Sequence, residues 1–138
     1  IRSSQHIACY KALKPEVDIT NLLILLEENN KKIYLPIPND NNTLSFAEWR
    51  LNEPLIFEKK CWVPRIKKIH EVEDLDCIII PCLGIDLNHR RLGRGSGYYD
   101  RTITKSCSTI AIVSTFQQIK ESIGLPHDII INKVIIID

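Results

Sequence analysis

The sequence lacks methionine altogether and contains only five glycines among its 138 residues. It also lacks long apolar runs, since none approaches the ~20 residues that a membrane-spanning helix needs. The pattern of a secretory leader, a charged segment followed by an apolar one, does not occur in this sequence. Because the first residue is Ile1, we expect a fragment, a processed chain or a sequence with residues missing. A membrane is therefore not among the expected partners.

Cysteine is present, but without the spacing that a disulfide framework or a zinc site requires. The count is odd and no C-x-x-C pair occurs. We interpret the cysteines as small buried hydrophobes in a reducing compartment, which predicts a cytoplasmic protein. They are Cys9, Cys61, Cys77, Cys82 and Cys107.

An excess of charge of one sign is also missing, because the net charge is +1. Apolar residues make up 44% of the chain and charged residues 25%, which is ordinary for one soluble globular domain. A nucleic-acid partner is therefore not expected. A local phosphate site stays open, since it needs only a few well-placed cations.

The first third of the chain has the pattern of a strand, a helix and a second strand. Residues 6–10 and 33–36 are short apolar runs, and leucines recur at helical spacing over residues 22–26. Asp18 or Thr20 is the expected helix cap. Such a unit has the length of a parallel crossover.

The rest of the chain predicts further strands in the same alternation. Residues 44–49 alternate like a half-buried strand, and the polar stretches 58–60 and 63–73 indicate a loop and a surface connection. The apolar run 77–80 is typical of a central strand covered on both faces. A helix over 98–106 and strands over 109–114 and 134–137 complete an α/β fold with a mostly parallel sheet.

Three of the five glycines, Gly93, Gly95 and Gly97, lie between the run at 77–80 and the expected helix. Glycine permits positive φ and close approach of a ligand to the main chain, and successive N–H groups there bind anions. Arg90, Arg91 and Arg94 add fixed positive charge suited to forked contact with phosphate. The spacing alone fits a structural turn about as well. Together with the arginines and the helix start, it favours a phosphate cradle.

Asp100 falls in the first turn of the expected helix. The helix dipole favours an acidic residue there without any ligand. The alternative is a Mg²⁺ ligand, because hard cations take carboxylate and phosphate oxygens together. The residue types leave both interpretations open.

The segment from Arg91 to Asp100, R-L-G-R-G-S-G-Y-Y-D, resembles the signature of the 5-formyltetrahydrofolate cyclo-ligase family. The resemblance extends over nearly the whole chain. Its further elements are Tyr10 with the E-V-D turn at 16–18, the segment I-P-C-L-G-I-D at 80–86 and the P-H-D element at 126–128.

This resemblance implies a single-domain, three-layer α/β sandwich, here without the family's N-terminal helix. It also implies conversion of 5-formyltetrahydrofolate to 5,10-methenyltetrahydrofolate with ATP and Mg²⁺. Asp100 and Asp128 are the implied Mg²⁺ ligands, and Glu16 is the implied folate contact. The implied catalytic residues are Arg91, Arg94 and Tyr98. The implied ATP-binding residues are Arg91, Gly93, Arg94, Gly95, Ser96, Gly97, Tyr98 and Tyr99.

Two other function classes stay open beside this enzyme. One is a relative that binds folate or nucleotide without catalysis. The other is an enzyme acting on a sugar phosphate with a similar scaffold, since fold does not fix function. We expect small-molecule substrates and a monomer in each case.

Overall fold

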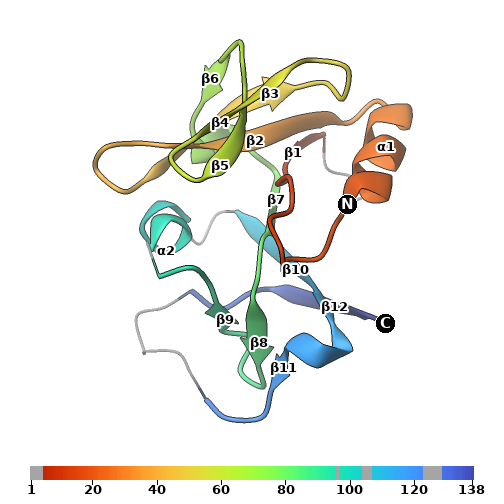
Figure 1. Cartoon of the computed structure of the whole chain (residues 1–138), viewed down its shortest axis with the longest axis vertical. Helices are drawn as coiled ribbons and strands as arrows, with labels where there is room; N and C mark the ends of the chain where they lie inside the picture. The colour runs from red at the N-terminus through yellow and green to blue at the C-terminus, as the bar shows by residue number, and fades with distance from the viewer. Residues whose placement is uncertain (1–4, 96, 104–106, 123–128) are drawn as a thin grey trace.

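The computed structural model describes residues 5–95, 97–103, 107–122 and 129–138. Figure 1 shows the elements, which begin and end as follows: β1 His6–Ala8, α1 Thr20–Glu28, β2 Lys32–Pro38, β3 Leu44–Trp49, β4 Leu55–Glu58, β5 Cys61–Pro64, β6 Ile69–His70, the 3-10 turn η1 Val72–Asp74, β7 Cys77–Ile80, β8 Gly84–Asp86, β9 Arg91–Leu92, α2 Tyr98–Thr102, β10 Ser108–Ser114, the 3-10 turn η2 Thr115–Gln117, β11 Gln118–Ile119 and β12 Lys133–Ile137. In this part of the chain, no helix has the length and apolar character that crossing a membrane requires.

The main sheet has the strand order β12-β10-β7-β1-β2-β3-β6. The pairings from β12 through β2 are parallel, and those of β3 with β2 and β6 are antiparallel. The chain leaves β1 toward β2 and leaves β7 in the opposite direction, toward β10 and β12. The strand order therefore reverses between β1 and β7, and such switch points are where open α/β sheets bind ligands.

The central strands are buried on both faces because alternate side chains point to opposite sides. Ile78 and Ile80 face a core that includes Tyr99 of α2. Ile79 faces a second core that includes Leu23 of α1. The sheet therefore lies between two covering layers, and the predicted three-layer α/β fold with a mostly parallel sheet is confirmed.

The predicted crossover is confirmed, with β1 and β2 paired in parallel and Ile7 opposite Ile33. The predicted cap is wrong, because Ile19 holds the cap position and no side chain bonds there. Asp18 acts one residue earlier, where its Oδ1 accepts a hydrogen bond from the Thr20 backbone N–H at 2.9 Å. One of the unpaired donors at the helix start is thus satisfied from outside the helix.

The predicted loop at residues 58–60 is instead part of a hairpin of β4 and β5. Lys59 and Lys60 form its turn, with φ of 47° and 67°. Positive φ at both central residues is the geometry of the tight turn that matches strand twist. Sequence propensity missed it, because Asn or Gly normally fills such positions. The predicted surface connection over 63–73 likewise holds the end of β5, β6 and η1.

Two further expectations need correction. The strand at 44–49 is buried along most of both faces, not half-buried, because the β4–β5 hairpin covers its second side. Helix α2 ends at Thr102, and Ile103 is already extended. The Thr102 hydroxyl donates to the Tyr98 carbonyl at 2.7 Å and accepts from the Leu44 N–H at 2.7 Å, which fixes this helix end against β3.

Candidate functional site

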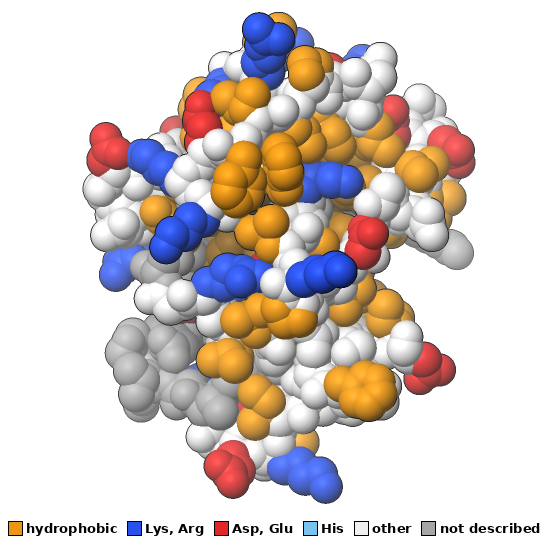
Figure 2. Space-filling view, in the orientation of Figure 1, with side chains coloured by type: hydrophobic (Ala, Val, Ile, Leu, Met, Phe, Trp, Pro, Cys, Tyr) orange, Lys and Arg blue, Asp and Glu red, His pale blue; other side chains and the backbone are white. Residues whose placement is uncertain are grey.

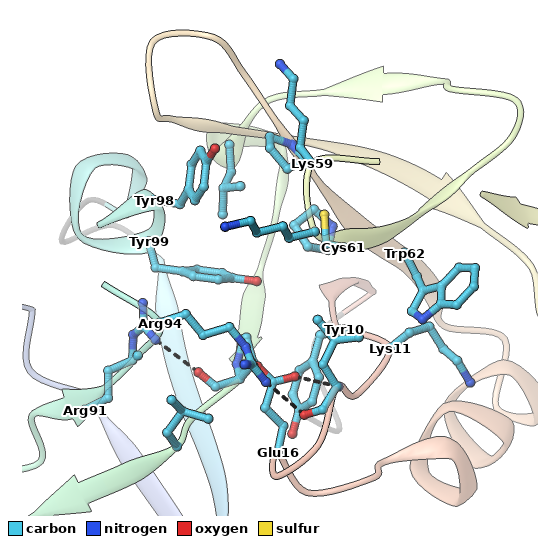
Figure 3. A pocket seen from close by; sticks show the side chains of 18 residues that line it. Tyr10, Lys11, Glu16, Lys59, Cys61, Trp62, Arg91, Arg94, Tyr98 and Tyr99 are labelled. Carbon is cyan, nitrogen blue, oxygen red and sulfur yellow. Dashed lines mark hydrogen bonds and ion pairs between the residues drawn. The ribbon is translucent and has the colours of Figure 1, made fainter. Parts of the chain in front are cut away.

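A cavity of about 370 Å³ opens where the strand order reverses, beside the ends of β1 and β7. The segment after β9 and the β4–β5 hairpin form further parts of its wall (Figure 3). In the space-filling view, lysine and arginine side chains form a band across the middle of the molecule, around a hollow (Figure 2). A cavity of this size suits a small organic ligand.

The cavity wall is strongly cationic. Its charged lining consists of one acid, Glu16, and five bases: Lys11, Lys59, Lys60, Arg91 and Arg94. A concave wall with charge of one sign concentrates ligands of the opposite sign. The site is therefore built for an anionic ligand, although the whole chain is nearly neutral.

Aromatic side chains form much of the remaining wall: Tyr10, Trp62, Tyr98 and Tyr99. Trp62 packs edge-on against Phe57 across the hairpin, with ring centroids 5.0 Å apart. The Tyr10 hydroxyl donates to the Val17 carbonyl at 2.9 Å. Burial raises the pKa values of Tyr10 and Tyr99 above their ordinary range, so both phenols stay neutral. Aromatic side chains in a cavity wall stack against the flat rings of a ligand.

Arg91 is held by its surroundings. Its Nη1 donates to the Pro81 carbonyl at 3.2 Å, and its guanidinium lies 5.1 Å from the centroid of the Tyr99 ring. Its Nε is buried without a partner in the described structure. A side chain added at Gly93 would begin 2.3 Å from Arg91 Nη1. Gly93 therefore leaves the space that the guanidinium fills.

Arg94 joins the glycine segment to the loop after β1. Its Nε donates to Glu16 Oε2 at 3.3 Å, and its Nη2 donates to the carbonyls of Leu13 and Lys14, each at 3.1 Å. The Glu16 side chain is only 8% exposed, whereas that of Arg94 is 41% exposed. Glu16 Oε1 also accepts from the Leu13 N–H at 2.8 Å. The pair thus links two predicted site residues that lie 78 positions apart.

Most of the predicted site residues do come together at this cavity. Its wall includes Glu16, Arg91, Gly93, Arg94, Tyr98 and Tyr99. Gly95, Gly97 and Asp100 are not part of the wall. Gly95 and Gly97 have φ of 87° and 71°, the backbone conformation for which the loop needs glycine. Ser96 and Asp128 lie outside the described residues.

The predicted helix dipole contributes less than the sequence suggested. Helix α2 has five residues, little more than one turn, so few peptide dipoles add up at its start. The positive charge of the site comes instead from the five basic side chains.

The described residues contain no cluster of three or more metal-ligating side chains. Asp100 is half-buried in the first turn of α2. A Mg²⁺ ion that bridges phosphates needs only one or two carboxylates, with water and phosphate oxygens filling its other positions. The single carboxylate of Asp100 is within that requirement.

The sequence missed the contribution of the hairpin. The cavity wall includes Lys59, Lys60, Cys61 and Trp62. The sequence predicted only a loop over residues 58–60 and no element at 61–62. The available signal was a lysine pair between two four-residue runs, L-I-F-E and C-W-V-P. Two short runs on either side of two polar residues fit a hairpin, although the turn lacks Asn and Gly.

Cys61 offers a chemical probe of the cavity. Burial, with Glu58 and Glu16 nearby, raises the pKa of its thiol to about 11. Since the thiolate is the nucleophile, we expect alkylation by iodoacetamide to accelerate about tenfold per pH unit from pH 7 to 10. Mass spectrometry of the Cys61 peptide measures the rate. A plateau near pH 8.5 would contradict the raised pKa, and Cys61→Ser identifies the labelled site.

Comparison with known proteins gives one consistent family. A model of the 5-formyltetrahydrofolate cyclo-ligase family matches residues 1–137. The 5-formyltetrahydrofolate cyclo-ligase of Mycolicibacterium smegmatis is 28% identical over 96% of this chain and 74% of its own length. That of Haemophilus influenzae is 27% identical over 86% of this chain and 68% of its own length.

Solved structures agree on the fold. The 5,10-methenyltetrahydrofolate synthetase of Aquifex aeolicus superposes with a TM-score of 0.80 and 26% identity, over 98% of this chain and 70% of that one. The synthetase of Mycoplasma pneumoniae gives a TM-score of 0.75 at 23% identity, over 96% of this chain and 73% of that one. The fold around the cavity is thus shared with both.

Proposed function

The chain belongs to the 5-formyltetrahydrofolate cyclo-ligase family, and we propose that it converts 5-formyltetrahydrofolate to 5,10-methenyltetrahydrofolate with ATP and Mg²⁺. ADP and phosphate are the other products. The observation that carries the proposal is the cavity at the sheet's switch point, which combines an aromatic wall with five bases and one acid. Flat rings and several negative charges are the features that folate and ATP share.

The reaction requires the formyl oxygen to become a leaving group. The oxygen attacks the γ-phosphorus of ATP, and the bond from that phosphorus to the β-bridging oxygen breaks to release ADP. N10 of the folate then attacks the activated carbon, N10 loses its proton, and phosphate departs with the former formyl oxygen. Phosphoryl transfer of this kind depends mainly on positioning and neutralisation of charge.

The residues of this chain suit those tasks. Arg91 and Arg94 would neutralise phosphate oxygens, with the aromatic faces of Tyr98 and Tyr99 beside them. Glu16 would accept hydrogen bonds from N–H groups of the folate ring, because a carboxylate keeps acceptor capacity beyond its two present bonds. Asp100 and Asp128 would hold Mg²⁺, which would supply positive charge to neutralise the phosphates. Gly95, Ser96 and Gly97 would present backbone N–H groups to ATP.

The state of the cysteines bears on the compartment in which we propose that the protein works. All five cysteines are free, which supports a reducing compartment such as the cytoplasm. We further propose that the protein acts as a monomer.

The direct test follows the absorbance of the methenyl product after 5-formyltetrahydrofolate, ATP and Mg²⁺ are mixed with the protein. We expect product only when all three are present, with one ADP formed per methenyl group. Turnover without ATP would contradict the phosphoryl-transfer step. Folate binding without turnover would support the non-catalytic relative instead, and sugar-phosphate binding without folate binding would support the third class.

A further inference from the structure

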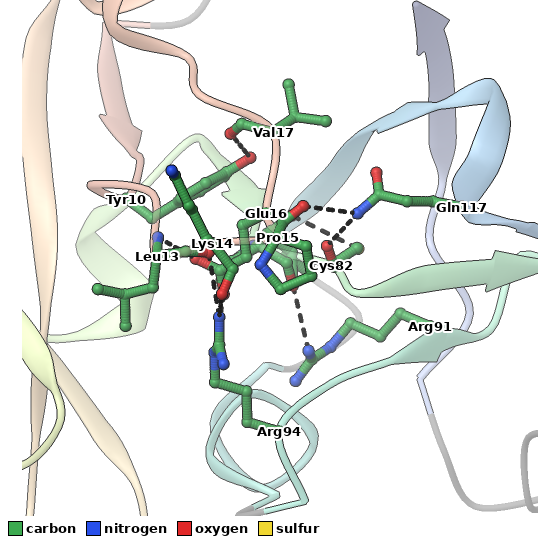
Figure 4. Close-up of polar contacts among 12 residues, drawn as sticks. Tyr10, Leu13, Lys14, Pro15, Glu16, Val17, Cys82, Arg91, Arg94 and Gln117 are labelled. Carbon is green, nitrogen blue, oxygen red and sulfur yellow. Dashed lines mark hydrogen bonds and ion pairs between the residues drawn. The ribbon is translucent and has the colours of Figure 1, made fainter.

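Gln117, in the 3-10 turn after β10, has all its polar atoms engaged although it does not line the cavity. Its Oε1 accepts from the Ser114 N–H at 2.9 Å. Its Nε2 donates to the Pro15 carbonyl at 3.2 Å and to the Cys82 carbonyl at 3.0 Å. The residue is 9% exposed. Figure 4 shows this amide between the loop after β1 and the end of β7.

The two carbonyls belong to segments of different burial. Cys82 follows β7, a central strand of the main sheet, and is 1% exposed. Pro15 lies in an exposed loop and directly precedes Glu16. Two carbonyl oxygens directed at the same place repel each other unless a donor lies between them. The amide of Gln117 is that donor, so it fixes the loop to the sheet.

We infer that Gln117 is a positioning residue that holds Glu16 in the cavity by fastening the Pro15 carbonyl to the end of β7. This inference rests on the proposed function, in which Glu16 contacts the folate. Arg94 holds the same loop from the cavity side through the Leu13 and Lys14 carbonyls. A ligand that draws Arg94 toward its phosphates removes that support. The loop is then held by Gln117 at Pro15 and by the Tyr10 hydroxyl at the Val17 carbonyl.

The kinetic test compares Gln117→Met, which keeps the length and loses the donors, with Gln117→Glu, which places a carboxylate against both carbonyls. We expect the KM for 5-formyltetrahydrofolate to rise about tenfold in Gln117→Met and further in Gln117→Glu. The KM for ATP should change less than about twofold. Gln118→Met, at the exposed neighbouring position, is the matched control and should behave as wild type.

A double-mutant cycle tests whether Gln117 acts through Glu16. If it does, Gln117→Met adds little to the loss already caused by Glu16→Gln. Additive effects of the two substitutions, or equal rises in both KM values, would overturn the inference. Should Gln117→Met fail to fold, Gln117→Asn takes its place in the cycle, because it keeps the amide but shortens its reach.

Hydrogen exchange gives a result that does not depend on turnover. In wild type the Glu16 N–H is bonded to the Leu13 carbonyl at 2.8 Å. We expect faster exchange in the peptide spanning residues 11–18 of Gln117→Met, with no change in peptides from β2 and β7. Unchanged exchange at 11–18 overturns the positioning role. Faster exchange in Gln117→Met, together with no turnover by the wild-type protein, would refute the proposed function and leave the anchoring role in place.

Discussion

Replacement of Arg94 by alanine is expected to lower kcat/KM for 5-formyltetrahydrofolate by about a hundredfold or more. The substitution removes the cation beside Glu16 and both hydrogen bonds to the Leu13 and Lys14 carbonyls. The cavity then loses one of five positive charges, and the Glu16 carboxylate stays mostly buried without its ion-pair partner. Removing one partner of such a pair costs more than the pair contributes when intact.

Two further variants make this result specific. Arg94→Lys keeps the charge but replaces the fork with a single ammonium, so we expect it to recover only part of the activity. Arg65→Ala removes an equal charge from an exposed position outside the cavity wall and should leave kcat/KM unchanged. Thermal unfolding of each variant separates loss of chemistry from loss of fold. A kcat/KM within about threefold of wild type for Arg94→Ala would remove Arg94 from the mechanism.

Replacement of Gly93 by alanine is expected to raise the KM for ATP by about ten- to a hundredfold, equivalent to ~1–3 kcal/mol. The new methyl carbon would lie 2.3 Å from Arg91 Nη1 and 2.9 Å from its Cζ. Arg91 would have to leave the Pro81 carbonyl and the face of Tyr99. Gly93 is not among the glycines with positive φ, so the effect is a displaced side chain and not backbone strain.

The matching control uses the Arg91→Ala background. There the guanidinium is absent, so adding Gly93→Ala should cost little more than Arg91→Ala alone. Steady-state kinetics with varied ATP measures all four proteins of this cycle. Strictly additive losses would show that Gly93 acts on ATP binding independently of Arg91.

Sequence patterns predicted the parts of the molecule that local chemistry determines. The apolar runs that became β1, β2 and β7 had to be buried. The glycines and arginines after them were predicted to form one site, because both can bind phosphate. The hairpin of β4 and β5 was not predicted, because its strands are short and its turn places two lysines at positive φ. Because the hairpin was not predicted, the place of Trp62 and of two of the five basic residues in the cavity wall was not predicted either.

The pairing of Glu16 with Arg94 was also beyond the sequence, although both residues were predicted to belong to the site. Spacing along the chain says nothing of a contact between residues 78 positions apart. Only the reversal of strand order brings the loop after β1 beside the segment after β9. The role of Gln117 could not be predicted either, because its partners are distant in the sequence and no pattern around it marks its amide.

These long-range contacts have a consequence for how the chain folds. Gln117 and Pro15 are 102 positions apart, so their contact joins two segments that are distant in the sequence. Closing so large a loop costs entropy before any contact offsets it, and contacts of this range slow folding. A partly folded chain that has formed only the β1–α1–β2 crossover presents no cavity. Ligand binding therefore favours the completed fold alone and raises the midpoint of unfolding as ligand concentration increases.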